Sequence, residues 1–239
     1  MRGKRIVTTA FALLFLFLLP IAAAEALTPE ESLKKNFPDL AYEAFGPSPV
    51  KGLYEVASGM QIYYYAPEAE ILIVGQLVAK DGNNLTAARK LEVIAGKVKE
   101  IPLEKALKIG NGENQVIEFS DPDCGYCRKA SEFFSKREDV TRYVFFFPLS
   151  EQSETKVRHI LCSADRERAY KNVYEGKPDG TVCVVCKDEK VEAIIKADRD
   201  AGNRLGIEGT PFFFINGKAV AGADLQLIEK LLTGRRPLH

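Results

Sequence analysis

The feature that most constrains the fold is the stretch FSDPDCGYCRKA, residues 119–130, which holds two of the five cysteines of the chain. The run QVIEFS just before it predicts a short apolar strand, and GYCRKASEFFSKR predicts a helix. Cys124 is therefore expected where the strand ends and the helix begins, with Cys127 one turn further along. Any fold adopted by this chain must place two thiols at a strand-to-helix junction.

The helix N-terminus bears directly on the chemistry of Cys124. Unpaired amide groups and the helix dipole favour an anion there, so we expect Cys124 to ionise readily and Cys127 to be more buried. The spacing also suits half of a zinc site. Such a site needs two further ligands, however, and the only histidines are His159 and His239. We interpret the two cysteines as a redox pair and expect no metal or other cofactor.

The first 24 residues predict a secretory signal peptide. A basic start over 1–5 precedes an apolar core over 10–19 and small residues up to Ala24 or Ala26, after either of which cleavage is expected. The apolar core is short for a membrane span, which needs about 20 residues. Export would bring the chain into an oxidising compartment, where disulfides persist. Basic and acidic residues are equal at 33 each, so nucleic acid is not an expected partner.

The next part of the chain predicts a small α+β domain over residues 25–84. It begins with a short helix within 28–40, and three runs between 51 and 80 are rich in the β-branched and aromatic residues of strands. A unit this small has little core of its own and leaves strand edges open. We therefore expect it to complete its core by dimerising.

A linker helix is expected over residues 85–108. Asn84 or Thr86 can cap it, its apolar residues follow helical spacing, and Pro102 ends the regular pattern. Its place between two strand-forming segments suggests that it connects two domains.

Residues 109–239 predict an α/β domain in which strands and helices alternate. Helices are expected over 153–175 and 187–205, with His159 exposed and DRERAYK forming a solvated face. Further on, PFFFI, the turn Asn216-Gly217 and KAVAG predict a hairpin, followed by a closing helix.

A resemblance to a known family rests on several of these motifs. Cys-Gly-Tyr-Cys at a strand-to-helix turn, with Gly-Thr-Pro before a late hairpin, resembles the thioredoxin superfamily. The strand-rich start, the linker beginning NNLTAARKL and the helix ILCSADRERAY make the whole chain similar to the periplasmic disulfide isomerases of the DsbC/DsbG family. The fold class implied is α/β: an α+β dimerisation domain, a linker helix and a thioredoxin-like domain with a helical insertion.

The resemblance also implies a mechanism and partners. Cys124 would attack a wrong disulfide in a misoxidised exported protein, and a substrate thiol or Cys127 would resolve the mixed disulfide. Gly125, Tyr126 and a cis Thr210-Pro211 bond would face the substrate. A V-shaped homodimer and a membrane thiol reductase of the DsbD type are the partners implied.

The remaining three cysteines leave their pairing open. The family has a structural disulfide from the Cys162 helix, and TVCVVCKDE offers both Cys183 and Cys186 as partners. A bond between Cys183 and Cys186 would instead make a second redox pair, and the three thiols together could hold a metal.

Two acidic residues depart from the pattern of the best-known disulfide isomerases. Glu118 lies on the strand beneath the active site, where those isomerases have an apolar residue and the DsbA oxidases have a buried acid. A buried Glu118 could act as base or acid for Cys127; an edge position would leave it solvated. Asp123 opposes ionisation of Cys124, but we expect it to turn toward water and be screened.

Three functions fit these features. The first is a dimeric thiol–disulfide isomerase. The second is a net oxidase or reductase, which the acid at position 118 keeps open. The third is a chaperone-like holder of unfolded proteins, in which the thiols are secondary.

Overall fold

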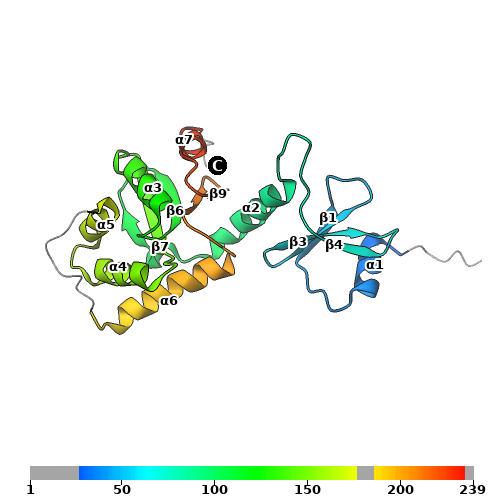
Figure 1. The fold of residues 1–239 in the computed structure, drawn as a ribbon, viewed down its shortest axis with the longest axis horizontal. Coiled ribbons are helices and arrows are strands. Elements are labelled where there is room, and N and C mark those ends of the chain that lie inside the picture. The colour runs from blue at the N-terminus through cyan, green and yellow to red at the C-terminus, as the bar shows by residue number, and fades with distance from the viewer. Residues whose placement is uncertain (1–26, 177–185, 235–239) are drawn as a thin grey trace, which may run out of the picture.

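The computed structural model of the protein describes residues 27–176 and 186–234, and two sheets with a helix between them dominate it (Figure 1). The N-terminal sheet is an antiparallel meander in the order β1-β2-β3-β4. Its strands are β1 (Ala44–Pro47), β2 (Tyr54–Ser58), β3 (Gln61–Ala66) and β4 (Ile71–Val74). The sequence did not predict β1, because two prolines mark that segment as a turn; Pro47 lies at the strand's end, on the edge of the sheet.

One short helix, α1 (Pro29–Asn36), covers this sheet. Thr28 and Glu31 form its capping box, and its buried Leu33 packs against Val56 and Tyr65. These contacts join the beginning of the described chain to the two central strands of the N-terminal sheet.

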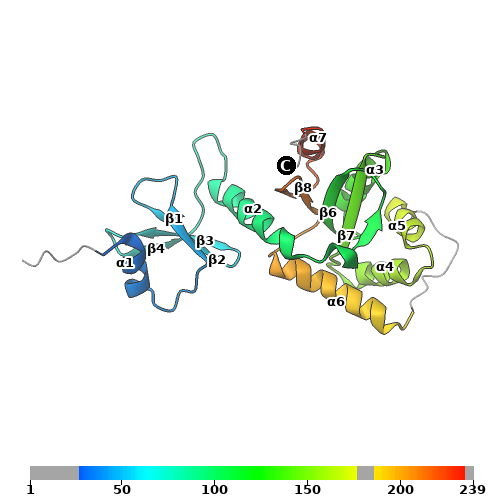
Figure 2. The same cartoon turned by 180° about the vertical axis from the view of Figure 1, so that it is seen from behind.

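The expected linker helix is α2 (Leu85–Lys97), which continues into the short 3₁₀ turns η1 (Val98–Glu100) and η2 (Leu103–Lys105). The Asn84 side chain caps it by accepting a hydrogen bond from the Ala87 amide. Thr86 is buried, and its hydroxyl accepts a hydrogen bond from the Leu77 amide. Figures 1 and 2 both show α2 lying between the two sheets.

The second sheet has five strands in the order β5-β7-β6-β8-β9. The parallel pair β6–β7 forms its centre, and the other pairs are antiparallel. The strands are β5 (Leu107–Ile109), β6 (Asn114–Ser120), β7 (Val140–Phe146), β8 (Phe212–Ile215) and β9 (Lys218–Ala221). Asn216 and Gly217 form the predicted turn, both with positive φ, as a tight hairpin requires.

Helices cover both faces of this sheet. Successive side chains of β8 point to opposite faces and pack against different helices. Phe213 and Ile215 pack with α3 (Gly125–Ser135) and α7 (Leu225–Thr233). Phe212 and Phe214 pack with α2 and with α6 (Glu189–Arg204). The linker helix is thus part of the core that supports the cysteine-bearing domain.

The helical insertion between β7 and α6 corrects three expectations. In place of one helix over 153–175 there are two, α4 (Glu151–Cys162) and α5 (Arg166–Glu175), because Asp165 caps a new helix. His159 is buried, not exposed, and Tyr170 of the supposed solvated face is fully buried. Over residues 27–176 and 186–234, no helix has the length and apolar character needed to cross a membrane.

Candidate active site

Cys124 occupies the N-cap position of α3 and is partly exposed. Its thiol donates a hydrogen bond to the Thr210 carbonyl oxygen, with 3.3 Å between the two atoms. The Thr210-Pro211 bond is cis, as the resemblance implied, and Tyr126, two residues after Cys124, is exposed. A strand-to-helix turn and a loop 86 residues further along the chain therefore meet at the sulfur of Cys124.

Cys127 faces the interior, and its side chain is fully buried. The backbone amide of Asp121 donates a hydrogen bond to its sulfur over 3.5 Å. Burial raises the pKa of the Cys127 thiol far above its usual value; the Asp121 hydrogen bond opposes this, and the charge of Glu118 adds to it. The pair is therefore divided into an accessible thiol at a helix N-terminus and a protonated thiol beneath it.

Glu118 is buried in β6 and is not solvated at an edge. Arg142 on β7 donates two hydrogen bonds to its Oε2, from Nε over 2.9 Å and from Nη2 over 2.6 Å. The same Nη2 also bonds the Tyr170 hydroxyl over 2.5 Å. Glu118 Oε1 is buried without a hydrogen-bond partner. The acid thus has a fixed cationic partner on one oxygen and a free acceptor on the other.

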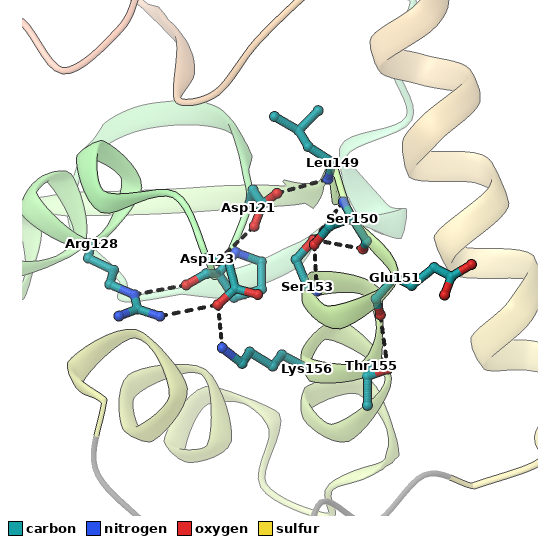
Figure 3. A network of polar contacts seen from close by, with 10 residues as sticks. Asp121, Asp123, Arg128, Leu149, Ser150, Glu151, Ser153, Thr155 and Lys156 are labelled. Carbon is teal, nitrogen blue, oxygen red and sulfur yellow. Dashed lines mark hydrogen bonds and ion pairs between the residues drawn. The ribbon is translucent and has the colours of Figure 1, made fainter.

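Asp123 does not turn into water as expected. Its Oδ1 accepts a hydrogen bond from Arg128 of α3 over 3.3 Å and another from Lys156 of α4 (Figure 3). The neighbouring Asp121 accepts from two backbone amides, that of Asp123 over 2.7 Å and that of Leu149 over 2.8 Å. The loop before Cys124 is therefore joined to both α3 and the helical insertion.

A disulfide joins Cys162 to Cys186, with 5.7 Å between their Cα atoms. It links the end of α4 to the segment just before α6. Cys183, the other expected partner, lies outside the described residues. Within the described ranges, no group of three histidine, cysteine or acidic side chains is placed to hold a metal ion.

Comparison of the sequence with known proteins identifies its family. Residues 20–87 match the disulfide bond isomerase protein N-terminal domain, and residues 101–225 match a thioredoxin-like domain. The probable thiol:disulfide interchange protein DsbC of Bordetella avium is 31% identical over 204 residues, which cover 82% of this chain and 71% of that one. The chain belongs to the DsbC family.

A second curated relative has the same family name, and a solved structure shares the fold. The thiol:disulfide interchange protein DsbC of Escherichia coli K12 is 29% identical over 187 residues, 74% of each chain. The thiol-disulfide exchange protein α-DsbA2 of Wolbachia pipientis aligns with a TM-score of 0.51 and 18% identity over 64% of this chain and 99% of that one, which shows the fold. As a DsbC-family protein, the chain is a thiol–disulfide oxidoreductase with a mixed α/β, thioredoxin-like architecture.

Proposed function

We propose that the protein isomerises wrong disulfides in exported proteins through Cys124 and Cys127. The Cys124 thiolate attacks one sulfur of a substrate disulfide, forms a mixed disulfide and releases the other sulfur as a thiolate. A second substrate thiolate then attacks the mixed disulfide, which restores Cys124 and leaves a rearranged substrate disulfide. No net electrons are exchanged in this cycle.

Cys127 can release the substrate from the mixed disulfide when no second substrate thiolate attacks it. After losing its proton, its thiolate attacks Cys124, releases a reduced substrate and leaves a Cys124–Cys127 disulfide. Two electrons must then be supplied before the next cycle. A membrane dithiol reductase of the DsbD type is the proposed donor.

The contact between Cys124 and Thr210 carries this proposal. It places the attacking sulfur beside the partly exposed Thr210, just before β8, where the backbone of Thr210 and Pro211 can bind an extended polypeptide. Gly125 and Tyr126, directly after Cys124, are exposed and would complete the substrate contact. A client cysteine held between them would lie within reach of Cys124.

We assign Glu118 the role of proton acceptor for Cys127. Burial keeps Cys127 protonated, so its attack on the mixed disulfide requires a base, and the unpartnered Oε1 of Glu118 can accept that proton. Arg142 holds the other oxygen and so fixes the orientation of the carboxylate. This role predicts slower release of the mixed disulfide in Glu118→Gln.

The proposed setting is the periplasm, reached by cleavage of the signal peptide after Ala24 or Ala26. A homodimer formed through the N-terminal sheet would place two Cys124 sites across one cleft. Exposed apolar side chains on the edge strand β4, Ile71, Ile73 and Val74, support pairing through that sheet.

Refolding of a scrambled multi-disulfide protein tests the function. We expect Cys124→Ser to abolish catalysed recovery and Cys127→Ser to retain part of it in the presence of a small thiol. Full recovery with Cys124→Ser would refute the proposal.

A net oxidase is the second candidate, because Glu118 supplies the buried acid typical of DsbA oxidases. Trapping the thiols in cells separates the two. An isomerase keeps Cys124 reduced, and an oxidase keeps it in a disulfide with Cys127.

A further inference from the structure

The acidic side chain next to the nucleophile is held by two cations from two different helices. Asp123 directly precedes Cys124, and its Oδ1 forms ion pairs with both Arg128 of α3 and Lys156 of α4 (Figure 3). Its Oδ2 is buried without a partner. A carboxylate in this position would disfavour a neighbouring thiolate, and two adjacent cations offset that effect.

The backbone of the loop that carries Asp123 is also held by hydrogen bonds. Asp121 accepts the amide hydrogen of Asp123, and Arg128 Nε donates to the Pro122 carbonyl over 2.9 Å. Asp121 also accepts from the amide of Leu149, just before α4. The backbone of the loop is thus fixed on both sides, and the ion pairs with Arg128 and Lys156 hold the Asp123 carboxylate.

Lys156 and Arg128 differ in how they are held. Arg128 has a second acceptor in Pro122, whereas every bond described for the Lys156 ammonium goes to Asp123. Glu154, two positions before Lys156 on α4, is paired with Arg158 and Arg199. Lys156 is therefore the cation whose place depends on Asp123.

We propose that Lys156 is a positioning residue for the redox reaction: its ion pair with Asp123 favours the thiolate of Cys124. The inference rests on the proposed attack by Cys124. It gives the helical insertion a part in the chemistry, because α4 supplies a charge to the active-site loop. It also explains how an acid can directly precede the nucleophile.

The test is ultraviolet titration of the Cys124 thiolate, recorded as the difference from Cys124→Ser so that Cys183 does not contribute. We expect Lys156→Gln to raise the titration midpoint by about 0.5 pH units and to slow alkylation of Cys124 about twofold. Lys156→Arg should restore both values. Asp123→Asn should lower the midpoint, and adding Lys156→Gln to it should change little.

Lys196→Gln is the matched control, because Lys196 forms an exposed ion pair with Asp200 on α6. It should leave the midpoint at its wild-type value. An unchanged midpoint in Lys156→Gln would overturn the proposal. So would an equal shift with and without Asp123→Asn, which would show a general charge effect. Because the titration needs no substrate, its result is independent of whether refolding requires Cys124.

Discussion

Arg142 donates two hydrogen bonds to one oxygen of Glu118, in a part of the sheet that solvent does not reach. The two residues lie on the adjacent parallel strands β7 and β6, and the guanidinium also lies 5.0 Å from the Phe134 ring centre and 5.2 Å from that of Tyr170. The pair is thus enclosed by α3 and α5, directly beneath the active site.

Removing the cation of this pair should strongly destabilise the fold. We expect Arg142→Met to lower the free energy of unfolding by about 3–5 kcal/mol, because it leaves a buried carboxylate without compensation. Urea unfolding measures the change. The double variant Glu118→Leu/Arg142→Met should be less destabilised than Arg142→Met alone. A loss below about 1 kcal/mol in the single variant would show that Glu118 does not carry a buried charge.

The Cys162–Cys186 disulfide should contribute to stability without taking part in the reaction. Its cysteines are 24 positions apart, and a loop of that size corresponds to about 3.5 kcal/mol in the chain-entropy model. We expect Cys162→Ala/Cys186→Ala to lose roughly that amount in urea unfolding while keeping alkylation of Cys124 unchanged. Peptide mapping of Cys183→Ser should still recover the 162–186 bond; a mapped bond between Cys162 and Cys183 in the wild-type chain would contradict the structure.

Local sequence signals predicted much of the fold around the site. The cysteine spacing located α3, the Asn216-Gly217 turn located the last hairpin, and the cap at Asn84 located the linker helix. Each of these features depends on residues close together in the chain. The short edge strand β5 pairs with β7, far along the chain, and the sequence did not reveal it; β1 was missed because its prolines indicated a turn.

The partners of the acidic residues were also missed. One signal was present for Arg142: it alternates with Val140, Val144 and Phe146 along an otherwise buried strand, so a buried opposite charge could have been inferred. No comparable signal exists for Lys156 and Asp123, which are 33 positions apart and meet only because α4 packs beside the active-site loop. His159 was misplaced because its charged neighbours face solvent while its own side chain faces the core.

Replacing each of two helical glycines by alanine should change the stability of the protein in opposite directions. A Cβ at Gly202 in α6 would lie 2.6 Å from the Phe147 ring, whereas one at Gly96 in α2 would meet nothing within 4 Å. We expect Gly202→Ala to cost about 1–3 kcal/mol through overpacking. Gly96→Ala should stabilise the protein by about 0.5–1 kcal/mol through helix propensity. Thermal unfolding of both variants checks this, and equal changes would rule out the close contact.

Asp198 should make stability fall as the pH rises. It is buried on α6 and accepts the Phe146 amide hydrogen on Oδ2, while Oδ1 has no partner. Burial raises its pKa from 3.8 to about 8, although the Phe146 hydrogen bond opposes the shift. Between these two values the unfolded chain has released the proton and the native protein still holds it. Folding therefore becomes less favourable with increasing pH, by up to about 1.4 kcal/mol per pH unit.

Asp198→Asn should remove that slope, because its side chain does not titrate, while its amide oxygen can still accept the Phe146 amide hydrogen. The measurement is the difference in unfolding free energy between variant and wild type from acidic to mildly alkaline pH. The unfolding free energy of the variant should rise relative to that of the wild type through that window. The difference should level off above about pH 8, where Asp198 is ionised in both states. Asp200→Asn, on the exposed side of the same helix, should show no such trend. A difference that stays constant across the window would mean that Asp198 titrates alike in both states, and its burial would then not govern its charge.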